Sequence, residues 1–292
     1  MKFKSIFILF NLVIIASFVF VFAMPFFALG ADFARTFWLS NWPLALVLVL
    51  ILGGIDGFFI SNQRLFSLLE REDWPALVSY LEDRVVKKGR YSSRLVRLLA
   101  NTYLVLSDSA AVVALEAKVA AAKPALLDKN ALVFAVARIL ANDPSGAAAF
   151  LAERKKSGKV EAPEWIQWYH AFSLLLNRDF AGAADVLLPL ASVAKDPLVI
   201  GLSASFMGDS ISRALPERKD ALVQSADAAT QRVLKGLPTR AAWDKETERA
   251  RSEIHVVILA KSLEEAAKSI YGAAAQKPAI AQKPSAREEA RS

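Results

Sequence analysis

The chain has 292 residues, a formal net charge of +7, 54% hydrophobic residues and no cysteine. Without cysteine there is no disulfide framework, thiolate metal site or cysteine nucleophile, and only two histidines argue against multi-histidine metal sites and His-based triads. A mean hydropathy of +0.33 is too high for an ordinary soluble protein, whereas 22% charged residues is too many for membrane spans alone, so two compositions are combined.

Residues 1–60 have the composition of a membrane segment. They hold 12 of the 18 phenylalanines, and Ser5–Leu29 carries no charge over 25 residues. Such a run is long enough to cross a hydrocarbon core of about 30 Å. A second stretch, Trp38–Ile60, is apolar apart from Asp56. We therefore predict a transmembrane helical hairpin at residues 1–60.

A cleaved signal peptide is the alternative for the first stretch, with Lys2 and Lys4 as its basic region and Ala28–Ala31 as the cleavage site. The apolar run exceeds the roughly 7–15 residues of such signals, which favours a retained span.

Basic residues at the span ends predict the orientation. They precede the first span and follow the second (Arg64, Arg71, Arg84, Lys87, Lys88 and Arg90), whereas the connection carries only Arg35, offset by Asp32. Both termini are therefore expected in the cytoplasm. The chain is predicted to be a multi-pass protein of a bacterial inner membrane with a cytoplasmic C-terminal domain.

Gly53 and Gly57 form a small-xxx-small pair within the second span, a pattern that lets two helices approach closely. We expect them to pack against the first span. Self-association between chains, giving a homo-oligomer, is the alternative.

Past residue 60 the sequence reads as helices, with an internal period of about 35 residues. Aspartates recur at Asp73, Asp108, Asp143 and Asp179. Each is followed at helical spacing by an apolar stripe, beginning with Leu77, Val112, Ala147 and Ala183. Each aspartate is therefore expected to cap the N-terminus of a helix.

A second apolar stripe precedes each aspartate. Its member eight residues back is small in three of four copies: Leu65, Ala100, Ala135 and Ala171. The unit is thus a helix, a tight turn beginning with aspartate, and a second helix. Over residues 61–197 it resembles the tetratricopeptide repeat, although the glycine before the turn is missing. The resemblance implies an α-solenoid of stacked helix pairs with a concave groove lined by the first helices.

The C-terminal third continues the helical pattern. Leu198–Ala214 and Glu217–Lys235 read as a further pair, and Thr239 to about Tyr271 as one long capping helix with a polar outer face. Residues 198–272 therefore close the array. Residues 273–292 are polar and alanine-rich, and we expect a disordered tail.

No motif of a nucleotide-binding or catalytic site is present, and His170 and His255 read as packed side chains in helices. We therefore expect no enzymatic activity, cofactor or metal. The basic excess is spread thinly, which argues against nucleic-acid binding and favours attraction to an anionic lipid bilayer.

Projection of the groove of tetratricopeptide arrays onto this sequence selects three residues per unit. They are Arg94, Arg97 and Asn101, then Lys129, Leu132 and Val136, then Trp165, Trp168 and Phe172. A basic end followed by an aromatic end would suit a protein or peptide partner with an acidic terminus. The alternative for Trp168 and Phe172 is packing between units.

These features predict an all-α protein: a hairpin-anchored adaptor or assembly scaffold with a tetratricopeptide-like groove. The alternative function is that of a structural subunit in a large bacterial envelope machine, such as a flagellar motor or secretion apparatus.

Overall fold

The computed structural model describes residues 3–158 and 160–276, and every regular element within these ranges is a helix. The chain divides into two compact units, Met1–Lys88 and Gly89–Ser292. The all-α prediction is therefore confirmed. The predicted domain boundary at residue 60 falls inside a helix, because nothing in Ser61–Leu69 breaks helical geometry.

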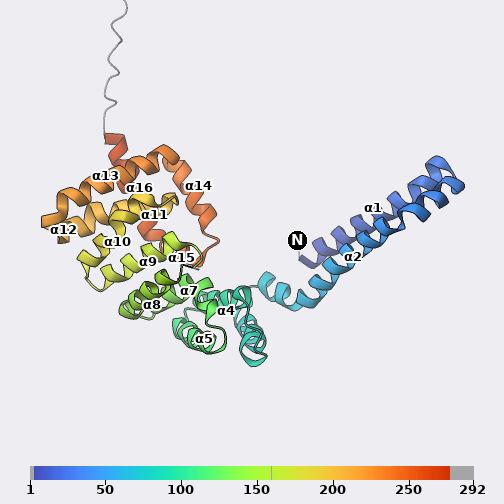
Figure 1. Cartoon of the computed structure of the whole chain (residues 1–292), viewed down its shortest axis with the longest axis horizontal. Helices are drawn as coiled ribbons and strands as arrows, with labels where there is room; N and C mark the ends of the chain where they lie inside the picture. The colour runs from blue at the N-terminus through green and yellow to red at the C-terminus, as the bar shows by residue number, and fades with distance from the viewer. Residues whose placement is uncertain (1–2, 159, 277–292) are drawn as a thin grey trace, which may run out of the picture. The chain divides into compact units, whose positions relative to one another are not determined.

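The first unit consists of two long helices and a short pair. Helix α1 spans Phe3–Leu29, α2 spans Ala31–Glu70, and α3 (Trp74–Glu82) continues into a π-helical turn, Asp83–Lys87. Figure 1 shows α1 and α2 side by side, and the rings of Phe22 and Trp38 stack between them with centroids 3.9 Å apart. Among the described residues, one segment, Phe7–Ala28, is long and apolar enough to cross a membrane.

Gly53 and Gly57 lie within α2, but a side chain built at either position would meet no atom within 4 Å. The expected close contact with the first span is therefore absent. The prediction failed because glycine spacing permits a close approach but does not select which face of the helix meets its neighbour.

The second unit contains the remaining helices. Their bounds are α4 Ser93–Val105, α5 Ser109–Ala122, α6 Ala125–Lys129, α7 Ala131–Leu140, α8 Pro144–Ser157, α9 Pro163–Leu176, α10 Phe180–Val193, α11 Pro197–Phe206 with a π-helical turn Met207–Ile211, α12 Ser212–Ala214, a 3₁₀ turn Pro216–Arg218, α13 Lys219–Gly236, α14 Arg240–Ala250, α15 Ile254–Ile258 and α16 Ala260–Gln276. From α4 to α11 each helix packs on the next one along the chain, and α4, α7, α9 and α11 also pack in a row.

The recurrent aspartates are N-caps, as predicted. The side chains of Asp73, Asp108, Asp143 and Asp179 each accept a hydrogen bond from the amide three residues on, over 2.8–3.2 Å. The small residues predicted to allow close packing, Ala100, Ala135 and Ala171, are fully buried.

The turn before each aspartate keeps its shape although the glycine is missing. The preceding residue takes a left-handed conformation in every copy: Glu72 (φ 52°), Ser107 (60°), Asn142 (60°) and Arg178 (62°). The amide of each aspartate donates to the carbonyl five residues back, which closes a Schellman turn. This backbone favours glycine, so the repeat keeps its geometry at some cost in strain.

The predicted single capping helix is wrong. The chain forms α14, a turn at residues 251–253, the short α15, and then α16. The turn contains no glycine or proline, so no residue in it indicates a break in the helix. Helix α16 also runs to Gln276, four residues into the predicted tail, and residues 277–292 lie outside the described residues.

The C-terminal helices bury one face against the rest of the second unit. Leu263, Ala266, Ala267 and Ile270 of α16 are buried, and α16 packs against α11 while α15 packs against α7 (Figure 1). The C-terminal segment therefore folds back along the row of first helices, where the groove for a partner was expected.

Candidate functional site

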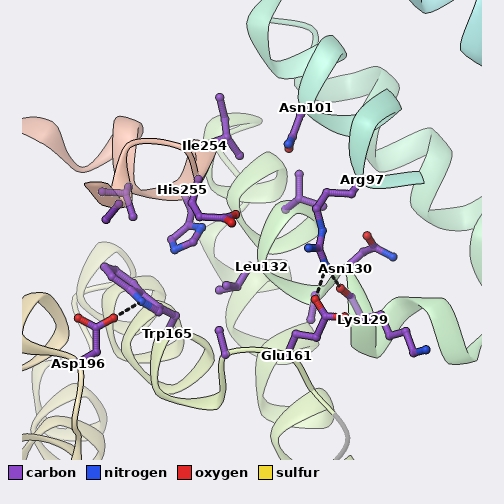
Figure 2. A pocket seen from close by; sticks show the side chains of 16 residues that line it. Arg97, Asn101, Lys129, Asn130, Leu132, Glu161, Trp165, Asp196, Ile254 and His255 are labelled. Atoms are coloured by element: carbon purple, nitrogen blue, oxygen red, sulfur yellow. Dashed lines mark hydrogen bonds and ion pairs between the residues drawn. The ribbon is translucent and has the colours of Figure 1, made fainter. Parts of the chain in front are cut away.

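A cavity of about 360 Å³ lies near the N-terminal ends of α7 and α9, beside α4. Its wall combines Arg97 and Asn101 of α4, residues around the start of α7, Trp165 of α9, and the segment after α14 (Figure 2). The full lining comprises Arg97, Asn101, Lys129, Asn130, Ala131, Leu132, Val133, Glu161, Ala162, Trp165, Asp196, Ala250, Glu253, Ile254, His255 and Val256. Residues more than 150 positions apart in sequence thus form one site.

Part of the predicted groove is brought together here. Arg97, Asn101, Lys129, Leu132 and Trp165 all line the cavity. These five residues, which the repeat spacing assigned to one surface, therefore share one cavity.

The other predicted groove residues lie elsewhere. Arg94 is exposed and does not line the cavity, and Val136 is buried. The Trp168 ring is 1% exposed and stacks on Phe172 with centroids 5.2 Å apart. Both rings also contact Phe206 of α11. Trp168 and Phe172 thus pack between helix pairs, which was the alternative interpretation.

Arg97 is already engaged within the protein. Its guanidinium forms an ion pair with Glu161 and donates to the Lys129 carbonyl oxygen over 2.7 Å. Figure 2 shows both interactions at the edge of the cavity. The expected role of Arg97, to hold a partner's carboxylate, would require breaking this pair. Glu161 was not among the predicted residues because it lies in the loop before α9, outside the repeated positions.

The ring of Trp165 is held in a fixed position. Its Nε1 donates to Asp196 Oδ2 over 2.8 Å, and the other carboxylate oxygen of Asp196 caps α11 by accepting from the Leu198 amide over 2.8 Å. The same indole and the ring of His255 pack edge to face, with centroids 4.8 Å apart. One wall of the cavity is therefore an aromatic surface fixed by hydrogen bonds.

The segment Arg251–Leu259 supplies another wall of the cavity through residues 253–256. The Tyr169 hydroxyl, which is buried, donates to the His255 carbonyl oxygen over 2.7 Å. Burial raises the pKa of Tyr169 well above its usual value, so this group remains a donor at neutral pH.

His255 itself is 6% exposed. Burial, assisted by the charge of Arg97, lowers its pKa to about 4, so the imidazole is neutral at physiological pH. Its Nε2 has no hydrogen-bond partner among the described residues. His170, the other histidine, is partly buried, and burial lowers its pKa as well. It does not line the cavity.

Two more buried polar atoms of the cavity wall lack partners within the described residues: Oδ1 of Asn101 and Oδ1 of Asn130. In most proteins such atoms are paired with protein, water or ligand. All three atoms have almost no accessible surface, so they lie beneath the cavity wall. The cavity itself, which joins segments distant in sequence, is the candidate binding site. Within residues 3–158 and 160–276 no cluster of three metal-ligating side chains is found.

The chain is similar in sequence to a known protein family. Residues 111–272 match the model of a family described as "Uncharacterised Treponema protein". This is more than half of the 292 residues. The chain belongs to this family. The matched residues run from α5 to α16, so they include every part of the cavity wall except Arg97 and Asn101.

A relative from Treponema pallidum (strain Nichols), described as an uncharacterized protein, is 35% identical over 173 residues. The aligned segment covers 59% of this chain and 54% of the relative, so the chain spans about half the length of that protein. No solved structure matches the chain.

Proposed function

We propose that this protein is a membrane-anchored adaptor whose tetratricopeptide-like helix pairs bind a segment of a partner protein in the cavity. The observation that carries the proposal is a cavity of about 360 Å³ that brings together Arg97, Leu132 and Trp165 from three successive first helices or their starts.

The repeated architecture supports a binding role. Four copies of one turn, each with a left-handed residue followed by a capping aspartate, join the two helices of each pair in the same way. Arrays of this kind present extended surfaces for other proteins. The absence of a metal cluster from the described residues neither supports nor opposes this role.

The surface of the first two helices supports a membrane anchor. Large apolar side chains along both are open to solvent, among them Phe20 (68% exposed), Leu39 (71%) and Leu50 (64%). Contiguous apolar surface of this extent is stable in lipid and unfavourable in water. We infer a two-span hairpin that comprises Phe7–Ala28 and the apolar part of α2, with the second unit in the cytoplasm.

Cysteine labelling tests the topology, because the chain has no cysteine of its own. Thr36→Cys lies in the predicted extracytoplasmic connection, and Lys245→Cys lies on the exposed surface of α14. A membrane-impermeant maleimide added to intact spheroplasts should label Thr36→Cys and spare Lys245→Cys. After permeabilisation both should react. Labelling of Lys245→Cys in intact spheroplasts would place the second unit outside.

Site-specific photocross-linking tests the binding role. A photoreactive phenylalanine analogue at Leu132, which is half-buried in the cavity wall, should give a discrete protein adduct in native membranes. The same analogue at Lys118, which is exposed on α5, should not give that adduct. Asn101→Leu places a bulkier, apolar side chain on the cavity wall, so it should weaken the adduct. No adduct at Leu132, or an adduct unaffected by Asn101→Leu, would refute binding in the cavity.

A further inference from the structure

Two arginines of the first unit lie against the same aromatic ring. Helix α3 runs back along the end of α2 and packs on it. The guanidinium carbon of Arg64 on α2 lies 5.4 Å from the centroid of the Tyr80 ring. That of Arg84, in the π-helical turn after α3, lies 5.3 Å from the same centroid. Nη1 of Arg84 also donates to Asn62 Oδ1 over 3.4 Å, so both cations are held at the same level of α2.

Neither arginine is neutralised by an ion pair. Within residues 3–158 and 160–276, no ion pair with a carboxylate involves Arg64 or Arg84. A guanidinium held over a ring keeps N–H groups that form strong, charge-assisted hydrogen bonds with phosphate oxygens. Arg64 is exposed and Arg84 is half-buried, so both can donate to a ligand at the protein surface.

The charges of the α2–α3 pair are separated along its length. Three carboxylates lie at the turn between the two helices: Glu70, Glu72 and Asp73. The opposite end, which we call the basic end, holds four cations and two carboxylates: Arg64, Arg84, Lys87, Lys88, Glu82 and Asp83. The formal sum at the basic end is therefore 4 − 2 = +2.

Asp83 does not cancel the charge of the arginines. Its carboxylate forms an ion pair with Lys88. The hydrogen bond from Lys88 lowers the pKa of Asp83, and the charges of Lys88, Lys87 and Arg64 lower it further. Asp83 therefore stays ionised in a positive field and offsets Lys88, which leaves the two arginines and Lys87 as the excess positive charge.

The basic end directly follows the apolar surface of α2. Phe58 and Ile60 are 58% and 68% exposed, and Arg64 comes four residues after Ile60, which is about 6 Å along a helix. An arginine at this distance from the last apolar residue can keep its stem on apolar surface and its guanidinium among polar groups. In a membrane, those polar groups are the phosphates of the lipid headgroups.

We infer that the basic end binds the phosphates of anionic phospholipids, with Arg64 and Arg84 as donors and the ring of Tyr80 holding both side chains in place. The inference rests on the proposed function, because it requires the apolar part of α2 to lie in a bilayer. Charge complementarity and continuity with the apolar surface of α2 both favour a lipid as the occupant. The carboxylates of the α2–α3 turn lie at the end of the pair that is farther from the lipid.

Lipid binding to the full chain tests the inference. The chain is purified in detergent micelles, and native mass spectrometry measures the dissociation constants of phosphatidylglycerol and phosphatidylcholine with identical acyl chains. The native chain should bind phosphatidylglycerol about tenfold more tightly or better, because each surface cation contributes to the attraction of an anionic lipid. Inorganic phosphate at the same concentration should not compete, because it cannot contact the apolar surface of α2.

Substitutions assign the preference to the basic end. Arg64→Gln and Arg84→Gln should each weaken the binding of phosphatidylglycerol by about fivefold. Arg71→Gln removes the same charge from an exposed position at the α2–α3 turn and should leave the binding unchanged. Tyr80→Leu removes the ring and should weaken binding by about two- to fivefold, whereas Tyr80→Phe keeps the ring and should have no effect.

The outcomes separate this inference from the proposed function. Equal binding of the two lipids by the native chain overturns the inference, and so does a loss in Arg71→Gln as large as that in Arg64→Gln. Competition by inorganic phosphate would show a general anion site and overturns the lipid as the occupant. The membrane anchor is decided independently by the labelling of Thr36→Cys and Lys245→Cys.

Discussion

Replacing Trp243 by alanine is expected to lower the free energy of unfolding by about 3–5 kcal/mol, the range for removing a large buried aromatic side chain. Trp243 on α14 is 1% exposed, and its ring lies directly against α11. Because α14 and α16 cover α11 together, the loss should also loosen α16. Urea unfolding of the full chain in micelles, followed by circular dichroism, measures the change. Val257→Ala, at a 46% exposed position, is the control and should change stability by less than about 1 kcal/mol.

Gly201 tests the same contact from the other side. A β-carbon at Gly201 would lie 2.5 Å from Cη2 and 2.7 Å from Cζ3 of Trp243. Gly201→Ala should therefore destabilise the native chain by about 1–2 kcal/mol through overpacking, although alanine is the better helix former.

In the Trp243→Ala background the same substitution should no longer destabilise and should stabilise by up to about 1 kcal/mol, because the helix propensity of alanine then opposes only the contact with Ile270 Cδ1 at 3.1 Å. Additive effects of the two substitutions would show that the ring and the glycine are not in contact.

Acidification is expected to destabilise the protein between pH 6.5 and pH 4 through His255. The folded-state pKa of about 4 lies below the usual value of 6.5, so the unfolded chain binds a proton in this window that the folded chain does not. The contribution of the neutral histidine is therefore fully present above pH 6.5 and is lost as the pH falls through the window. Linkage gives a total loss of about 3 kcal/mol.

His255→Phe isolates this contribution. The phenyl ring keeps the packing against Trp165 but cannot be protonated, so the variant should lose less stability on acidification than the native chain. Comparison of the two cancels the effects of His170 and the carboxylates. Direct NMR titration of the two histidines provides a second measurement. A His255 pKa near 6.5 would contradict the predicted pH dependence.

Hydrogen exchange locates the effect. Since His255 lies in the segment Arg251–Leu259, which is held by the hydroxyl of Tyr169, acidification should increase the opening of this segment before that of α9. Uniform opening of all helices would instead show that the segment unfolds only with the whole unit.

The sequence predicted local structure well where one residue determines it. Asp73, Asp108, Asp143 and Asp179 marked four helix starts because a capping carboxylate acts on amides within its own first turn. The buried alanines were likewise visible from helical spacing. Such features depend on neighbours within one or two turns, and the sequence order contains that information.

The groove prediction was only partly correct for a different reason. Repeat spacing showed which side of the first helices would carry Arg97, Asn101 and Trp165, and these residues do share one cavity. It could not show that Glu161 would pair with Arg97 or that Trp168 would be covered by Phe206 of α11. Those neighbours come from loops and from a helix outside the matched repeats.

The sequence by itself determined an all-helical chain, an apolar N-terminus and a repeated helix pair with aspartate caps, because short-range hydrogen bonding and side-chain periodicity encode all three. Only the tertiary structure decided that the chain turns at residues 251–253 and returns across its own first helices. That return depends on the contact of Trp243 with Gly201 and on the hydrogen bond that the Tyr169 hydroxyl donates to the His255 carbonyl oxygen. These contacts join residues more than 40 positions apart, and no local pattern records which distant surfaces fit each other.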